Sequence, residues 1–534
     1  MSYNINVDKK ENKLNSVEIL KLEKDGLDII ETILNKYSKV GYYSITKDDM
    51  DRFKWAGVYQ QRPRDGHFML RVRNTGILNL EQVRTLAKIS KDYGRGLINI
   101  TTRGAIQFHW ICVENLPDIF NRLKEVSLSS VEACGDCTRT IVGNPLAGID
   151  KDELMDTTEL INSLNEFFLF NRDFSNFPRK FKISISSNIF NAAHAEINDL
   201  SFTPAVKNIN GVEKIGFHLW VGGGLSTTPH LAKKLSIFAL PEDVLKVAIG
   251  VATIFRDYGY REKRNRARLK FLIEDWGVDK FQEKLLEIIG DMQSLGEDRL
   301  VNWNAAYFYG VHKQKQLDKN YIGLNVPFGE LNSDDFFELA KICEKYGDSN
   351  IRTTLSQNLI ISGVGSEHLP SILNEPIFKS FSPDPSSFIG HSVACTGKEF
   401  CNFAIVETKK IATDVCSYLD KCYLDKTIEL DSPIRIHFTG CPNACGQKQI
   451  GDINLQGALI KTEDGLVEAF DIFLGGTLGL NAKFSEALNC RVKSSDVAQT
   501  LKTLILFYKR NRDIEETFNQ FVNRVGVESF KENI

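Results

Sequence analysis

The sequence predicts a mixed α/β protein that is internally duplicated and therefore pseudo-two-fold symmetric. Two distant stretches match when one is shifted by 253 residues along the chain. Each copy has the order strand, helix, strand, strand, which is typical of sheets that pack against helices. Each copy is also followed by a larger region with further helical patterns. Identical residues at matching helix, turn and strand positions favour duplication over chance similarity.

The elements of the two copies follow one order. Each copy starts with a short apolar strand, continues with a helical run that leads to a Tyr-Gly pair, and closes with two apolar strands. The strands are expected at 68–72, 98–101 and 106–111 in the first copy and at 321–326, 351–354 and 359–362 in the second. The helical runs contain Leu86, Ala87 and Ile89 in the first copy and Leu339, Ala340 and Ile342 in the second. Ahead of them, 15–36 is predicted to form one amphipathic helix of an N-terminal arm, and the Pro-rich stretch 370–385 a linker. The predicted domains are 1–51, 52–128, 129–307, 308–380 and 381–534.

Composition and charge exclude several classes of protein. The 534 residues are 42% hydrophobic and 25% charged, which is typical of a globular protein and not of a disordered or fibrous one. The formal net charge of −3 gives no general affinity for nucleic acid or anionic membranes. The N-terminus has no signal-peptide pattern, and apolar stretches such as 244–254 are too short to span a bilayer. We therefore expect a cytoplasmic protein without a membrane anchor.

Six of the eleven cysteines crowd between residues 395 and 445. Because cytosolic thiols stay reduced, this crowding indicates a metal site rather than disulfides. Cys395 and Cys401 form a C-x5-C motif, and Cys441 and Cys445 form C-x3-C. Zinc sites usually use C-x2-C pairs, whereas an iron–sulfur cubane accepts wider spacing, so four thiolates here favour an iron–sulfur cluster.

Two more cysteines serve as an internal comparison. Cys416 and Cys422 also have the C-x5-C spacing, but they lie in or just after a helical run with no Gly or Pro beside them. We predict that these two are core or surface thiols and not cluster ligands.

Several segments resemble a known family. The segments are "ACTGKEFCNFAIVETK", "TGCPNACGQ", "VGNPLAGID", "FPRKFK" and "VGGGLS". They are similar to the sirohaem-containing assimilatory nitrite and sulfite reductases that take electrons from ferredoxin, and the resemblance runs from about Trp55 to the last helices. It implies a three-domain architecture with two ferredoxin-like half-domains, 52–128 and 308–380. It also implies a [4Fe–4S] cluster on Cys395, Cys401, Cys441 and Cys445, with Cys445 also the axial ligand of the sirohaem iron.

Sirohaem carries eight carboxylates, so its pocket needs cations and amide donors. The resemblance assigns this role to Arg103, Gln107, Arg264, Gln357 and Asn443, and it adds Cys445 as a haem-binding residue through the iron. Arg264 and Arg268 have the i,i+4 spacing of one helix face, and without the resemblance the basic run 261–270 would be interpreted as a solvated face.

The substrate needs cations of its own. Arg71 and Arg73 alternate with apolar residues, as do Lys180 and Lys182, so each pair is expected on one strand face. Taken alone, such alternation is more often a solvated face, but paired cations also suit a small oxyanion. In the family, residues that match Arg71, Arg139, Lys180 and Lys182 bind the substrate or deliver protons.

The predicted activity is the six-electron reduction of sulfite to sulfide, with nitrite reduction to ammonia as the alternative. Lys182 favours sulfite, since a doubly charged anion needs more positive charge, whereas "CTGKEFC", "ETKK" and "VGNPLAGID" look more like the nitrite branch. Gly222-Gly223-Gly224 lacks dinucleotide-binding spacing, so electrons should arrive from ferredoxin. We expect ferredoxin to dock near the cluster on basic residues such as Lys398, Lys409 and Lys448.

Three further points concern alternatives. A non-catalytic iron–sulfur protein would not need the basic residues or the sirohaem-like segments. A dissimilatory sulfite reductase subunit would need a sister subunit, whereas both halves are present here, so a monomer is expected. Some ferredoxin sulfite reductases of the family carry a cysteine cross-linked to a tyrosine near the haem, and Cys134 and Tyr59 match those positions.

Overall fold

Two central sheets each take one strand from the other repeat. The computed structural model describes residues 14–303, 307–463 and 465–532. One sheet has the order β1-β2-β5-β4-β14 and the other β12-β13-β16-β15-β3. The strands are β1 (Val58–Gln60), β2 (His67–Val72), β5 (Ile106–Cys112), β4 (Leu97–Ile100), β14 (Glu330–Asn332), β12 (Gly310–Lys313), β13 (Lys319–Leu324), β16 (Leu359–Gly365), β15 (Asn350–Thr353) and β3 (Ile77–Asn79). Because β3 and β14 are exchanged, the predicted half-domains 52–128 and 308–380 interlock.

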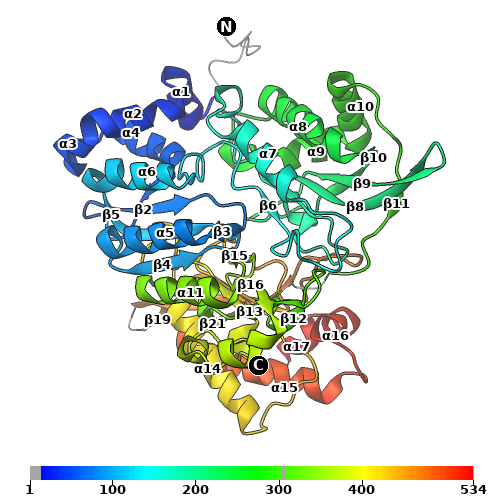
Figure 1. Cartoon of the computed structure of the whole chain (residues 1–534). Helices are drawn as coiled ribbons and strands as arrows, with labels where there is room; N and C mark the ends of the chain where they lie inside the picture. The colour runs from blue at the N-terminus through cyan, green and yellow to red at the C-terminus, as the bar shows by residue number, and fades with distance from the viewer. Residues whose placement is uncertain (1–13, 304–306, 464, 533–534) are drawn as a thin grey trace.

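The two central helices follow the exchanged strands directly. α5 (Leu80–Tyr93) and α11 (Ser333–Tyr346) start 253 residues apart and lie against each other in the middle of the molecule (Figure 1). The same capping box starts both, with Asn79 and Asn332 as N-cap residues. One continuous apolar core joins both half-domains.

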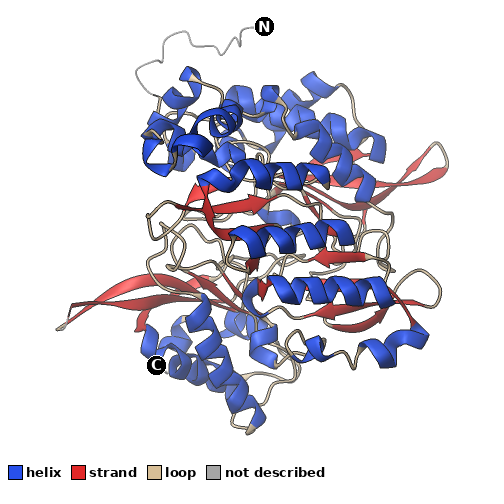
Figure 2. Cartoon of the chain, turned by 60° about the vertical axis from the view of Figure 1, so that its left-hand side comes forward, coloured by secondary structure: helices blue, strands red, loops and turns tan. Residues whose placement is uncertain are grey.

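Two outer sheets repeat one pairing pattern. Their orders are β10-β9-β8-β7-β6, with β11 beside β8, and β17-β18-β19-β20-β21. In each, two parallel pairings are followed by two antiparallel ones. The strands are β6 (Val142–Gly143), β7 (Ile183–Ile185), β8 (Leu200–Ile209), β9 (Val212–Val221), β10 (Lys233–Ala239), β11 (Glu297–Asp298), β17 (Ser392–Ala394), β18 (Ile436–Thr439), β19 (Ile453–Thr462), β20 (Gly465–Leu474) and β21 (Glu486–Lys493). Two long hairpins protrude on opposite sides of the molecule (Figure 2).

The offset of 253 residues persists far beyond the elements that revealed it. It relates the first residues of β8 and β19, at Leu200 and Ile453, and those of α8 (Val244–Tyr258) and α15 (Val497–Asn511). The remaining helices are α6 (Leu116–Glu125), α7 (Thr158–Phe168), α9 (Leu269–Trp276), α10 (Val278–Ile289), α12 (Leu369–Ile372), α13 (Ser387–Gly390), α14 (Lys409–Leu424), α16 (Phe518–Val525) and α17 (Glu528–Lys531). The internal duplication therefore covers most of the chain. No helix among the described residues is both long and apolar enough to cross a bilayer.

The N-terminal arm is not the single helix that was predicted over 15–36. Its described part contains α1 (Ser16–Glu23), α2 (Ile29–Thr32), α3 (Ser38–Val40) and α4 (Lys47–Arg52). Asp25 caps a tight turn after α1, and Gly26 packs so closely on Trp55 that a Cβ would lie 2.3 Å from the indole ring. Tertiary packing therefore breaks the helical pattern. Residues 1–13 lie outside the described part of the chain.

The predicted linker 370–385 is also part of the packed structure. α12 begins at its N-terminal edge, and Phe378 and Phe381 are buried in the core shared by the half-domains. Aromatic burial therefore anchors this Pro-rich stretch.

Candidate active site

Two neighbouring parallel strands bring the cysteine motifs to one edge of a sheet. β17 ends directly before Cys395, and β18 ends two residues before Cys441. Because β17 and β18 are parallel, their carboxyl ends lie side by side. The Cys395 amide donates to the carbonyl oxygen of Phe438 at 3.1 Å, which ties the first motif to β18.

The four cysteines of the two motifs influence one another electrostatically. Burial, together with the nearby Cys445, raises the pKa of Cys395 to about 12 and that of Cys441 to about 11. Burial and Cys445 likewise raise the pKa of Cys401. Such mutual influence requires the thiols to lie close together. Cys445 is the exposed member of the set.

The backbone around these thiols is closely fitted. The Gly440 amide donates to Cys395 Sγ at 3.2 Å, and the Gly440 carbonyl accepts from the Ile405 amide at 2.8 Å. Gly397 has φ +77°, and a Cβ there would lie 2.6 Å from Thr408 Oγ1. A backbone N–H aimed at a thiol and glycines where side chains would clash fit a sulfur-ligated cluster.

Cys416 and Cys422 lie elsewhere. Both are in α14 and are buried in the apolar core of the C-terminal region, where Cys416 contacts Ser392 Oγ at 3.3 Å. Within the described ranges, no group of three or more His, Cys, Asp or Glu side chains is arranged to hold a single metal ion.

Lys180, Lys182 and Arg139 come together at the start of β7. The Arg139 amide donates to the Phe181 carbonyl at 2.8 Å, so Arg139 lies beside the two lysines. Burial and the positive charges of Arg268, Arg139 and Arg179 lower the pKa of Lys180 to about 7. Cys445 opposes this shift, which places the lysine near the exposed cysteine.

The Lys182 ammonium is in a similar environment. Burial, Arg103, Lys180 and Arg268 lower its pKa well below the usual range. No hydrogen bond or ion pair holds this ammonium within the part of the chain that the structure describes. Both lysines are half-buried beside these arginines, and the region that the cations share, called the recess below, has a strong positive potential.

Arg71 reaches the same region from β2. Its guanidinium donates to Gln107 Oε1 at 3.0 Å and contacts Cys134 Sγ at 3.6 Å, while its Nε is buried without a partner. Tyr59 lies close by, since burial and Cys134 raise its pKa to about 12. The structure thus brings Tyr59, Cys134 and Arg71 together.

Arg103 links the turn after β4 to the outer sheet. It donates to Asn198 Oδ1 at 2.7 Å and to the Thr140 carbonyl at 2.8 Å, and its buried Nε has no partner. Next to it, Thr102 Oγ1 donates to the Cys445 carbonyl at 3.1 Å. The first repeat therefore contacts the exposed cysteine directly.

Several predicted residues have contacts other than those expected. Arg264 and Arg268 are not on one helix face, because Arg264 lies in a tight turn and Arg268 directly precedes α9. Arg264 binds Asp136 through two hydrogen bonds of 2.7 and 3.0 Å. Arg73 directly follows β2, where it is buried and donates to the Thr138 carbonyl at 2.8 Å, so its guanidinium is bound within the protein.

Gln357 and Asn443 also differ from simple haem donors. Gln357 Nε2 donates to the Ile100 carbonyl at 3.0 Å, and its Oε1 accepts from the Ala394 amide at 3.1 Å, so its amide ties the two repeats together. Asn443 is exposed, and its hydrogen bonds to Cys441 act against the upward shift of that thiol's pKa.

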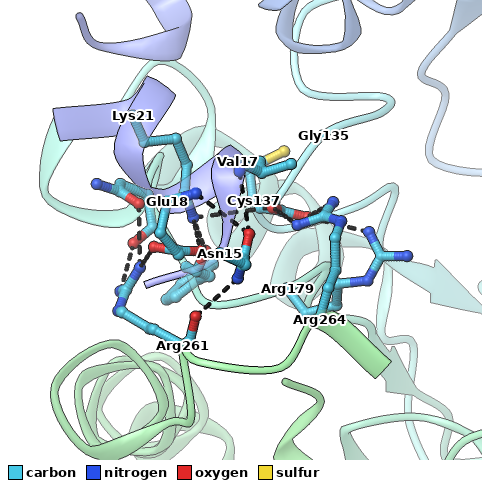
Figure 3. A network of polar contacts seen from close by, with 12 residues as sticks. Asn15, Val17, Glu18, Lys21, Gly135, Cys137, Arg179, Arg261 and Arg264 are labelled. Atoms are coloured by element: carbon cyan, nitrogen blue, oxygen red, sulfur yellow. Dashed lines mark hydrogen bonds and ion pairs between the residues drawn. The ribbon is translucent and has the colours of Figure 1, made fainter. Parts of the chain in front are cut away.

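A buried polar network joins α1 to the loop that contains Asp136 (Figure 3). Lys21 of α1 donates to the Phe177 carbonyl at 2.8 Å and pairs with Glu18 at 2.5 Å. Its ammonium lies 3.8 Å from Asp136 Oδ2. Burial alone would raise the pKa of Asp136, but Lys21, Arg264 and Arg179 outweigh it and hold this pKa far below its usual range.

Three groups at the site were not predicted from the sequence, namely Arg179, Asp136 and Asp199, which accepts the Lys182 backbone amide at 2.9 Å. Arg179 is part of the "FPRKFK" segment and binds Asp136 at 3.4 Å. Asp136 itself carries no local signal. Asp199 could have been found, because Lys182 and Asp199 correspond to Arg435 and Asp452 at the repeat offset.

The three lysines expected to dock ferredoxin are not free cations. Lys398 pairs with Glu468 at 2.7 Å, and Lys409 pairs with Glu330 at 3.1 Å. Lys448 is buried against the ring of Phe473.

The chain is similar to known proteins over most of its length. A family model described as the nitrite and sulphite reductase 4Fe-4S domain matches 134–291 and 387–534, and one described as the nitrite/sulfite reductase ferredoxin-like half domain matches 59–126 and 312–378. The chain is 38% identical to the ferredoxin–nitrite reductase of Synechococcus elongatus, covering 92% of this chain and 96% of that one. It is 35% identical to sulfite reductase [ferredoxin] 1 of Mycolicibacterium paratuberculosis, covering 97% and 96%. The structure of the Mycobacterium tuberculosis NirA protein matches with a TM-score of 0.92 and 35% identity over 97% of each chain.

Proposed function

Because the chain belongs to the nitrite and sulfite reductase family, an oxidoreductase family that depends on ferredoxin, we propose that its physiological reaction is the reduction of sulfite to sulfide. The observation that carries this choice is the Lys182 ammonium, which has no hydrogen-bond or ion-pair partner among the described residues and lies near further cations. Relatives of similar identity are named for either substrate, so the choice rests on the recess itself.

The family carries sirohaem and a [4Fe–4S] cluster, and the residues at the site fit both groups. Cys395, Cys401, Cys441 and Cys445 would ligate the cluster, with Cys445 shared with the haem iron. The buried Nε atoms of Arg71 and Arg103 have no acceptor among the described protein groups, which suits anionic groups in the recess. Gln107, Arg264, Gln357 and Asn443 would contribute less to the haem carboxylates, because part of their hydrogen-bonding capacity is already used. When bound, the coupled cofactors supply the electrons for the reduction.

The remaining chemistry belongs to this chain. Arg71 and Arg139 would orient the oxyanion through charged hydrogen bonds. Lys180 and Lys182 would hold it and release protons as oxygen leaves as water. The lowered pKa values of Lys180 and Lys182 favour that release, because a lysine with a lowered pKa gives up its proton more readily than a solvent-exposed lysine.

Sulfite is favoured over nitrite by charge. Burial and the positive charges of Arg103, Lys180 and Arg268 lower the preference of Lys182 for the proton, and an anion relieves this repulsion in proportion to its charge. Sulfite reaches two negative charges near neutral pH, whereas nitrite carries one. Nitrite remains the second candidate, since the Synechococcus elongatus relative bears that name.

Ferredoxin would approach over the Cys401 loop. Arg64 Nε donates to Asn402 Oδ1 at 3.1 Å, and Arg62, which lies close to Cys401, acts against the upward shift of that thiol's pKa. Phe403 is 68% exposed in the same loop. Two arginines and an exposed aromatic ring near a cluster ligand suit an acidic electron-transfer protein.

We further propose that the enzyme works in the cytoplasm as a monomer.

The substitution Lys182→Asn tests the substrate assignment. It removes one charge and keeps a donor, and a charged hydrogen bond is worth about 1.5–3 kcal/mol. The kcat/KM for sulfite should therefore fall about ten- to a hundredfold, and that for nitrite should fall less. Lys214→Asn, on the exposed β8–β9 hairpin, should change neither. Equal losses for both substrates in Lys182→Asn would contradict a role in selectivity.

A further inference from the structure

We propose that Arg268 is a positioning residue that occupies Asp199 and thereby leaves Lys182 free to meet the anion. The inference rests on the proposed function for its catalytic consequence, but its structural part concerns only these three residues.

Arg268 and Asp199 form a buried two-point ion pair. Arg268 Nε and Nη2 donate to the two Asp199 oxygens at 3.1 and 2.8 Å. Asp199 is fully buried and Arg268 is only 8% exposed. The same carboxylate also accepts the backbone amide of Lys182 at 2.9 Å. An anionic carboxylate therefore lies at the base of the lysine side chain.

Lys182 does not use this nearby carboxylate. The charged groups that face its ammonium are Arg103, Lys180, Arg268 and Asp199, and of these only Asp199 is negative. A lysine would ordinarily pair with such a carboxylate. Here the guanidinium of Arg268 takes both oxygens, so the ammonium remains in the recess.

The second repeat shows what happens without such a guanidinium. At the offset of 253 residues, Lys182 becomes Arg435 and Asp199 becomes Asp452. The backbone contact is retained, since the Arg435 amide donates to Asp452 Oδ2 at 2.9 Å. However, the Arg435 side chain folds back and donates to the same carboxylate through Nε and Nη2, at 2.9 and 2.6 Å.

The residue in the place of Arg268 explains the difference. Thr517 directly precedes α16, as Arg268 directly precedes α9, so the two residues correspond by their place before the helix, at an offset of 249 residues. The Thr517 hydroxyl caps α16. No second guanidinium competes with Arg435 for Asp452 among the described contacts. The Arg435 side chain thus binds the Asp452 carboxylate that its own backbone amide contacts. Lys182 does not bind Asp199 in the same way, because Arg268 holds that carboxylate.

A glycine makes room for Arg268. A Cβ at Gly224 would lie 2.9 Å from Arg268 Nη2, and its equivalent in the second repeat is Thr477. The neighbouring Gly222 amide donates to the Asp199 carbonyl at 3.0 Å, as the Gly475 amide does to Asp452 at 2.9 Å. Gly224 of the "VGGGLS" segment therefore leaves space for the Arg268 guanidinium, which the second repeat lacks.

The test measures the reactivity of Lys182 as well as turnover. Limiting acetic anhydride labels neutral amines, and mass spectrometry of the peptide that carries Lys182 reports how much of it is unprotonated. In Arg268→Gln, Lys182 should pair with Asp199, its labelling near neutral pH should fall at least tenfold, and the KM for sulfite should rise about ten- to a hundredfold. Arg268→Gln combined with Asp199→Asn should restore both, because no carboxylate then captures the lysine.

Two further variants complete the experiment. Arg266→Gln, in the neighbouring turn, should behave as the unmodified enzyme, since Arg266 pairs with Glu274 and Asp275 of α9 and not with Asp199 in the described part of the chain. Asp199→Asn alone should increase Lys182 labelling, and it carries the test if Arg268→Gln does not fold. Unchanged labelling in Arg268→Gln, no recovery in the double variant, or reduced labelling in Asp199→Asn would each overturn the proposal. If the labelling behaves as stated but sulfite is not reduced, the proposed function fails and the positioning role stands.

Discussion

Lys180 and Lys182 derive their expected chemistry from the cations around them. An isolated lysine is fully protonated at neutral pH, whereas burial beside Arg268, Arg139 and Arg179 lowers the pKa of Lys180 to about 7. The protein thereby places a proton donor near the pH at which a cell operates.

This shift predicts a pH dependence. With nitrite as the probe, whose charge is constant above about pH 6, kcat/KM should decline as pH rises through about 7, because Lys180 then loses the proton that holds the anion. Lys180→Arg should move this decline to much higher pH while lowering kcat, since arginine keeps its charge and does not release a proton. Superimposable pH profiles for the two enzymes would contradict the assignment.

The cluster assignment gives a second prediction. Cys395→Ser, Cys401→Ser and Cys441→Ser should each abolish activity and the visible iron–sulfur absorption. Cys416→Ser and Cys422→Ser should keep both, because these thiols are buried in an apolar core away from the site. Iron content and the visible spectrum of purified variants decide the matter, and loss of the cluster in Cys416→Ser with retention in Cys401→Ser would reverse the assignment.

At the scale of elements, α1 supports the recess from behind. Lys21, Glu18 and Asp136 are all buried, and the α1 residues are joined to the loop that carries Arg139 through contacts across more than a hundred positions. Breaking a buried pair by removing one partner typically costs about 3–5 kcal/mol.

Lys21→Met should therefore destabilise the enzyme by about that amount, because it leaves Glu18 and Asp136 with fewer compensating charges. Urea unfolding measures the loss, and Lys39→Met, at an exposed position of the same arm, is the matched control. Equal stability of the two variants would show that α1 is a peripheral element.

Local patterns predicted the elements that are stabilised locally. Strands and the helices after β3 and β14 lie where apolar periodicity and the Tyr-Gly pairs placed them. The predicted helix face shared by Arg264 and Arg268 failed, because each guanidinium binds an aspartate from a distant segment, and these tertiary contacts outweigh the local preference. No local pattern in the sequence reports such partners.

At the scale of the molecule, the duplication was predictable, but its interlocking was not. The exchanged strands β3 and β14 are three residues each, too short for a pairing partner to be inferred from periodicity. The duplication also allows equivalent positions of the two repeats to take different roles. One repeat keeps Lys182 free in a cationic recess, whereas the other uses Arg435 and Asp452 as an internal ion pair.

We propose that the enzyme reduces sulfite in preference to nitrite because of the cations in the recess. The most direct test is to measure kcat/KM for both anions side by side, with purified holoenzyme and reduced ferredoxin. We expect the enzyme to reduce sulfite to sulfide, with a higher kcat/KM for sulfite than for nitrite. A higher kcat/KM for nitrite, with ammonia as the product and little sulfide from sulfite, would contradict it.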